Sequence, residues 1–79
     1  MRVFVLWAWD MINERFLYRD KFVVKDAGEA IYYLENVVGD AESEGWDCNR
    51  DARGCYVCSK VDGDRIVMQR QICIEEIKD

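Results

Sequence analysis

A short amphipathic helix between two strand-rich halves is the feature that most constrains how this chain can fold. Asp26 is placed to cap the helix, and Glu29 three residues later resembles the second member of a capping box. Apolar residues then recur at spacings of three and four and share one face: Ala27, Ala30, Ile31, Leu34 and Val38. Gly39 is placed to end the helix, and the opposite face carries Glu29, Tyr32 and Asn36. A helix with one apolar face needs a sheet to cover.

The residues before this helix predict two strands. Residues 2–12 are dominated by Val, Phe, Leu and Trp, which suit strands. Residues 15–24 place apolar side chains on alternate positions, the period of a half-buried strand: Phe16, Tyr18, Phe22 and Val24. We expect a tight hairpin at Asn13-Glu14 between the two runs.

The residues after the helix predict a loop and a second hairpin. The apolar pattern lapses after Gly39 until Gly54, and loops of this length tend to be functional or mobile. Residues 55–61 and 65–74 then predict two strands around an Asp-Gly turn at positions 62 and 63. A two-residue turn there pairs Val61 with Asp64, Ser59 with Ile66 and Val57 with Met68. Val57, Ile66 and Met68 are then expected on the core face.

Together these elements predict one α+β domain over residues 1–79. The expected order is β-β-α-β-β, an antiparallel sheet of about four strands with the helix packed on one face. The chain has 79 residues, of which 51% are hydrophobic, so it can bury one small core. The apolar run at residues 3–9 is too short for a signal peptide or a membrane span, and we expect a cytoplasmic protein.

Enzymatic chemistry is limited by the residue types that are absent. The chain has no histidine, so the commonest general base and metal ligand are missing. Its two serines, Ser43 and Ser59, therefore have no histidine partner, and a Ser-His or Cys-His nucleophile pair is impossible within one chain. The acidic side chains form no pair on regular elements facing one cleft. We expect no enzyme and no cofactor.

Four cysteines leave three interpretations open. Cys48, Cys55, Cys58 and Cys73 include a single CxxC, and the second short pair of a typical zinc site is missing. Residues three apart on a strand also point to opposite faces, which argues against one ion held by Cys55 and Cys58. Free cysteines packed as small apolar residues are the favoured interpretation, with zinc binding and disulfides as alternatives. Cys48, in the loop, is the candidate for an intermolecular disulfide between two copies.

Negative charge is concentrated in the middle of the chain. Residues 26–51 contain eight acids and one base, Arg50, which gives −7, whereas the whole chain carries −5. The eight acids are Asp26, Glu29, Glu35, Asp40, Glu42, Glu44, Asp47 and Asp51. Solubility alone is one explanation. Calcium binding is a weak alternative because the EF-hand spacing is absent. Direct binding to nucleic acid is disfavoured because a phosphate backbone requires a basic patch.

A surface that resembles a charged phosphate chain can instead occupy a basic groove made for nucleic acid. An exposed Trp46 within the acidic loop would be a binding anchor, and Tyr32 on the outer helix face a second one. The alternative for Trp46 is that it folds back and pins its loop onto the core. Trp7 and Trp9 share a face with neighbouring valines and are expected in the core or across the sheet's second face in a dimer.

Glu29, Glu35 and the run 40–47, DAESEGWD, carry a resemblance at the level of class. A small, acidic, single-domain chain of this kind resembles phage-encoded inhibitors of host defence, above all the anti-CRISPR proteins. The resemblance implies a compact α/β fold and inhibition by occupying the nucleic-acid path of a CRISPR effector. It covers no specific motif and assigns no site residue.

The sequence therefore predicts a non-enzymatic protein that blocks a basic nucleic-acid-binding surface of a partner protein, without itself binding nucleic acid, membrane or metal. The partner-binding candidates are Glu29, Tyr32, Glu35, Asp40, Glu42, Glu44, Trp46, Asp47 and Asp51. The alternatives are a small structural or assembly subunit that dimerises through its sheet, and a cysteine-based zinc-binding module.

Overall fold

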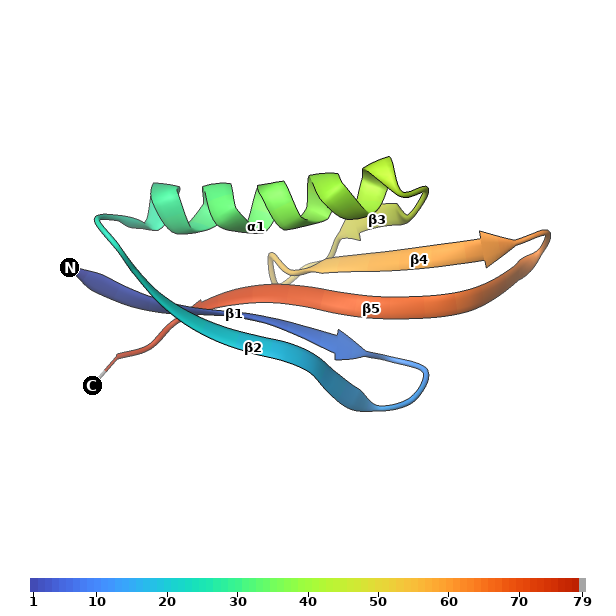
Figure 1. The fold of residues 1–79 in the computed structure, drawn as a ribbon, viewed down its shortest axis with the longest axis horizontal. Coiled ribbons are helices and arrows are strands. Elements are labelled where there is room, and N and C mark those ends of the chain that lie inside the picture. Colours follow the sequence, from blue (N-terminus) through green and yellow to red (C-terminus); the bar gives the residue numbers. More distant parts are fainter. Residues whose placement is uncertain (79) are drawn as a thin grey trace.

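One helix lies across one face of a five-stranded antiparallel sheet (Figure 1). The structure is a computed structural model and describes residues 1–78. Its elements are β1 (Arg2–Asp10), β2 (Arg15–Val24), α1 (Ala27–Ser43), β3 (Asp47–Arg50), β4 (Tyr56–Asp62) and β5 (Arg65–Glu76). The strand order across the sheet is β2-β1-β5-β4-β3. The α+β class and the single helix on an antiparallel sheet are confirmed, and the sheet has one strand more than expected because the loop contains β3.

The core lies between α1 and the sheet and has two parts. Phe4, Val24 and Ala30 are buried near the start of the helix. The larger part lies under its middle and end, and consists of Leu6, Ala8, Leu34, Val38, Ala41, Trp46, Cys58 and Ile72. The predicted apolar face of the helix therefore packs on the sheet, although Ile31 at its margin stays exposed.

The helix begins where the sequence predicts and ends one turn later. The Asp26 carboxylate accepts a hydrogen bond from the Glu29 amide at 2.9 Å, and Glu29 Oε2 accepts one from the Lys25 amide at 3.0 Å. This reciprocal pair is the predicted capping box. The expectation that Gly39 ends the helix is wrong. Ala41 is buried in the core and holds the next turn in place, and the chain leaves the helix at Gly45, whose φ of 93° suits glycine.

The β1–β2 connection is longer than the tight hairpin expected at Asn13-Glu14. Asp10 pairs with Arg15, and four residues lie between them. The Asp10 carboxylate accepts hydrogen bonds from the amides of Ile12 and Asn13, each at 3.0 Å, and so closes the turn. A bulge follows in β2, because Ala8 pairs with Tyr18 whereas Trp9 pairs with Phe16.

The bulge at Leu17 explains why the alternation predicted for β2 is only partly right. Tyr18 and Phe22 pack on the main core beneath the helix. Phe16 instead packs on the opposite face, with its ring 4.8 Å from Trp9 and 5.9 Å from Trp7 between centroids. One extra residue moves every later side chain of that strand to the other face. The two tryptophans thus form a half-buried aromatic cluster on the face without the helix.

The register predicted for the β4–β5 hairpin is wrong. Asp62 pairs with Arg65 and Val61 with Ile66, so that Gly63 and Asp64 form the turn, and a bulge follows next to Lys60. The expected core positions at this end are exposed, with Ile66 at 53% and Met68 at 46%. The hairpin extends past the end of the helix in Figure 1, so nothing covers it. The buried residues of these strands lie further back: Cys58, Ile72 and Cys73.

Two disulfides replace the free cysteines that we favoured. Cys48 is bonded to Cys58 and connects β3 to β4, and Cys55 is bonded to Cys73 and connects the β3–β4 loop to β5. No cysteine is free among residues 1–78, so the expected intermolecular bond at Cys48 is wrong. The sequence left this pairing undecided because β3, which brings Cys48 beside Cys58, has only four residues and no alternation of apolar side chains.

Candidate acidic binding surface

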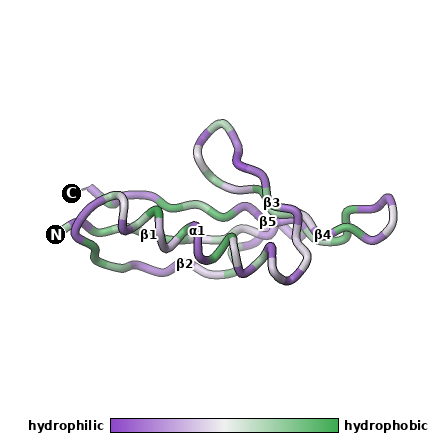
Figure 2. Tube along the Cα trace, turned by 90° about the horizontal axis from the view of Figure 1, so that it is seen from above, coloured by the Kyte–Doolittle hydropathy of each residue, from purple (hydrophilic) through white to green (hydrophobic). Residues whose placement is uncertain are grey.

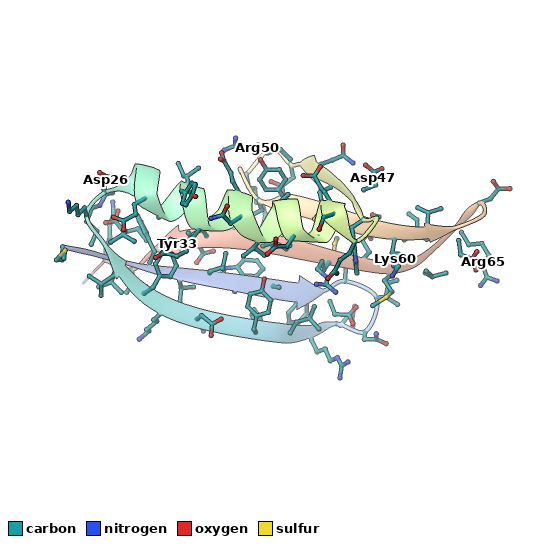
Figure 3. All side chains as sticks on the ribbon, turned by 45° about the horizontal axis from the view of Figure 1, so that its top comes forward. Asp26, Tyr33, Asp47, Arg50, Lys60 and Arg65 are labelled. Carbon is teal, nitrogen blue, oxygen red and sulfur yellow. A yellow bond between two sulfur atoms is a disulfide. The ribbon has the colours of Figure 1, made fainter. Side chains whose placement is uncertain are left out.

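Six of the predicted partner-binding acids are exposed along α1 and just beyond its end. We call these six residues the acidic surface: Glu29, Glu35, Asp40, Glu42, Glu44 and Asp47. Four lie within the helix, Glu44 is its C-terminal capping residue, and Asp47 begins β3. Figure 3 shows Asp47 where α1 ends, with Lys60 below it on β4 and Arg65 further out on the β4–β5 hairpin. The acids thus follow the helix in space and are continued by the adjoining strand.

Helix geometry divides the acids of α1 into two rows. At 100° per residue, Glu35 and Glu42 project to one side of the outer face, and Glu29 and Asp40 project to the other. Tyr32 lies between the rows and is 63% exposed, as predicted from the helix pattern. Two rows of carboxylates therefore flank one exposed aromatic ring.

These carboxylates have no basic partner. Between residues 26 and 47 the chain has seven acids and no Lys or Arg. Over residues 1–78 the one ion pair joins Arg2 and Glu76, at 2.7 Å, and involves no member of the acidic surface. Arg50, the nearest base in sequence, lies with its guanidinium 5.9 Å from the centre of the Tyr56 ring. No member of the acidic surface therefore forms an ion pair within residues 1–78, although Glu29 Oε2 accepts the hydrogen bond of the Lys25 amide.

The acids at the end of α1 are also placed against the helix dipole. Asp40 and Glu42 lie in the last turn, Glu44 follows at the cap, and the last turn has no basic residue. The C-terminal end of a helix carries a partial negative charge, so each acid there is destabilising. Asp40 and Glu44 are also four residues apart, where like charges repel. Stability of the helix does not explain why the acids are there.

Trp46 is not the exposed anchor that the sequence suggested. It is buried, at 7% exposure, and packs in the main core beneath the end of the helix. Arg70 covers it, with the guanidinium carbon 4.0 Å from the ring centroid, a cation–π contact. Burial raises the pKa of the neighbouring Tyr18 phenol, and the charge of Arg70 opposes that rise. The alternative interpretation, in which Trp46 pins its loop to the core, is the correct one.

Asp51 is committed to the structure of the β3–β4 loop. Its carboxylate accepts hydrogen bonds from the amides of Arg53 at 2.8 Å and Cys55 at 3.0 Å, and from the Gln71 side chain at 3.3 Å. Desolvation acts to raise the pKa of Asp51, but these hydrogen bonds and the charge of Arg53 outweigh it, so that the pKa is lowered. Asp51 therefore lies outside the acidic surface, and we no longer count it as a contact residue.

Other sites are sparse in the part of the chain that the structure describes. Residues 1–78 contain no group of three or more acidic, cysteine or histidine side chains placed to hold a metal ion. No helix in that range is long and apolar enough to cross a membrane. The sequence did not predict the contact between Arg70 and Trp46. The two residues are 24 positions apart, and no local pattern around Arg70 indicates the contact.

The geometry defines a class: a small disulfide-linked α+β domain that displays an uncompensated acidic helix. No protein-family model, curated protein or solved structure matches the chain.

Proposed function

We propose that this chain is a non-enzymatic binding protein whose acidic surface occupies a basic, nucleic-acid-binding surface of a partner protein. The partner class that the sequence resemblance implies is a host defence complex, and the activity is inhibition of the anti-CRISPR type in the host cytoplasm. The observation that carries the proposal is the set of six exposed carboxylates without a basic partner on one helix and its continuation. The acids at the end of α1 lie against the helix dipole, and a cationic surface on a partner would relieve that unfavourable interaction.

Electrostatic competition supplies the mechanism. A basic groove attracts any polyanion of suitable shape, and clustered charge raises the rate of encounter. The capping box and the burial of Leu34 and Val38 hold the helix against the sheet, so the carboxylates are presented by a rigid element. The exposed ring of Tyr32 offers an aromatic contact between the rows, and aromatic residues are enriched in binding hot spots.

A matched pair of double variants tests the proposal. Glu35→Gln with Glu42→Gln removes one row of the acidic surface, and Asp20→Asn with Glu75→Gln removes two exposed acids elsewhere. Both double variants change the net charge by the same amount. The wild type and the two double variants are immobilised on separate supports. Proteins from the native host are then captured on each support at low and at high salt. The captured partner is then tested for displacement from labelled DNA or RNA.

We expect the wild type to capture a nucleic-acid-binding protein and to displace its nucleic acid, with binding that weakens as salt rises. The row variant should lose about 10-fold or more in affinity, because close charge pairs couple by more than 1.4 kcal/mol. The control variant should bind like the wild type. Equal binding by both variants, with both folded, would refute the proposal.

A further inference from the structure

The end of the β4–β5 hairpin projects from the domain as an arm. We call residues 60–68 the arm, and every one of them is exposed. Figures 1 and 2 both show the arm extending beyond the helix and beyond the β1–β2 hairpin. Its large apolar side chains are 46–53% exposed: Val61, Ile66, Val67 and Met68. Exposed apolar side chains gathered on one projecting element are a feature of interaction sites.

Neither edge of the arm is covered by a neighbouring strand. On one side, β3 pairs with β4 only as far as Ser59. On the other side, the pairing of β1 with β5 reaches Arg70, and the Met11 amide adds one hydrogen bond to the Gln69 carbonyl at 2.9 Å. Within residues 1–78 the outer strand edges of the arm therefore face solvent along with its apolar side chains.

A hollow of about 160 Å³ lies at the base of the arm. Apolar side chains from both hairpins form much of its wall: Ile12, Leu17, Val67 and Met68. Arg15 and Arg70 also line it. The one acid among the lining residues is Asp10, whose carboxylate accepts hydrogen bonds from the amides of the β1–β2 turn. Arg70 is fixed against Trp46, and its buried Nε has no hydrogen-bond partner. The hollow is the size of a side chain and suits a carboxylate that arrives with apolar neighbours.

The tip of the arm presents the side chains that such a hollow would accept. Asp62 and Asp64 flank the turn glycine, and Val61 and Ile66 are the first apolar side chains on either side. Figure 2 shows the purple turn directly beyond green segments of the arm. Lys60 and Arg65 are also exposed on the arm, so the contact with the basic hollow depends on the two aspartates themselves.

We infer that two copies of this chain associate through reciprocal arms, with the acidic tip of each seated in the hollow of the other. Arg70, at the base of the arm, lies six residues from Asp64 at its tip, which is about 20 Å at the rise of a strand. Two arms that lie side by side in opposite directions bring each tip to the base of the other arm, where the hollow lies. The contact is two-fold symmetric, buries the exposed apolar side chains, and gives Arg70 a carboxylate partner.

Charge reversal in the full-length protein tests this arrangement. Asp62→Lys with Asp64→Lys reverses the tip, and Arg70→Glu reverses the hollow. The molar mass of each protein is measured by light scattering and sedimentation over about a hundred-fold range of concentration, because association depends on concentration. Asp20→Lys with Glu75→Lys is the matched control, since both residues are exposed and lie outside the arm and the hollow.

We expect the wild type and the control to reach twice the monomer mass, and each reversed protein to remain monomeric. An equimolar mixture of the two reversed proteins should recover the dimer, because the reversed tip then meets the reversed hollow while the other contact is that of the wild type. A monomeric wild type at every concentration, or a mixture that stays monomeric, would overturn the inference. If Arg70→Glu unfolds by circular dichroism, the tip variant decides alone, and a dimeric tip variant rejects the arrangement. None of these substitutions touches the acidic surface, so the outcome is independent of the proposed function.

Discussion

Removing a negative charge from opposite ends of α1 should change stability in opposite directions. Glu29 lies in the first turn of the helix and Glu42 in the last, and both are exposed. The helix dipole places partial positive charge at the start and partial negative charge at the end. Glu29→Gln should therefore destabilise the protein, and Glu42→Gln should stabilise it. Glutamine keeps the size of the side chain and can still accept the hydrogen bond from the Lys25 amide.

The size of the effect follows from the exposure of both side chains. An exposed charge in the first or last turn contributes about 0.3–1 kcal/mol at low ionic strength. The two variants should therefore differ from each other by about 0.6–2 kcal/mol in their free energies of unfolding. For a domain of this size that is a difference in Tm of roughly 3–15 °C. The last turn has no basic residue that could reduce the gain at Glu42.

Urea and thermal unfolding, followed by circular dichroism, measure this difference. Both variants are compared with the wild type at low salt and again at high salt, where screening should shrink the gap. A shift of both variants in the same direction would show that net charge, and not position in the helix, controls the effect. A gap that persists at high salt would also contradict the argument from the dipole. If Glu42→Gln gains stability and loses partner binding, the acid at that position is explained by function.

Three further perturbations have defined outcomes. Replacing Cys48 and Cys58 by Ala should lower the free energy of unfolding by about 2–4 kcal/mol in urea titrations, and an unchanged value would mean that the bond does not form. Because the folded pKa of Asp51 lies below its unfolded value, Asp51 should contribute stability above about pH 4 and lose it as the pH falls further. Unfolding measured between about pH 2 and pH 6 should show a weaker acid dependence for Asp51→Asn, and an identical dependence would refute the role of the carboxylate. Trp46→Ala should cost about 3–5 kcal/mol by denaturant unfolding, whereas a loss below about 1 kcal/mol would show that the ring is not part of the core.

The start of the helix was predictable because its determinants lie within a few residues of each other. Asp26 and Glu29 form the capping box through contacts between neighbouring turns. The end of the helix was not predictable in this way. Gly39 is a common stop signal, but the burial of Ala41 against the sheet outweighs the preference of one glycine. Tertiary packing decided the end, and local pattern decided the start.

The strands were found from apolar alternation, but their registers were not. Each of the two hairpins contains a bulge. One lies in β2, opposite Ala8 and Trp9, and the other lies in β5, opposite Lys60 and Val61. A bulge shifts the alternation by one residue, and no residue type in these runs marks its position. The bulge in β2 is why Phe16 was assigned to the wrong environment, whereas Ile66 was misplaced because the turn lies one residue later than predicted and the hairpin extends past the helix. β3 was missed because its four residues contain no alternation of apolar side chains.

The acidic surface was predictable because helix geometry and local charge are both read directly from sequence. Glu35 is exposed as the helix pattern requires; Asp40 and Glu42 were predicted in an exposed loop, and they are exposed in the last turn of the helix. Trp46 and Asp51 were misjudged because their environments depend on residues far along the chain. Arg70 covers Trp46, and Gln71 binds Asp51. Exposure of a loop residue cannot be inferred without knowing which strand lies beside it.

The disulfides and the function that we propose point to different compartments. Stable disulfides are typical of oxidising compartments, whereas inhibition of a defence complex takes place in the reducing cytoplasm. Both bonds lie in the part of the fold built from β3, β4 and β5. The first half of α1 packs on Phe4 and Val24, where no cysteine contributes.

Reduction should therefore loosen β3 and the end of α1, next to Asp40, Glu42, Glu44 and Asp47, while the first half of the helix stays in place. Partner binding is measured with and without a reductant, in parallel with helix content by circular dichroism. This comparison distinguishes a partner in the reducing cytoplasm from a partner in an oxidising compartment. A cytoplasmic partner requires that binding survive reduction. Loss of binding on reduction, with most of the helix retained, would place the partner in an oxidising compartment and would exclude a CRISPR effector as the target.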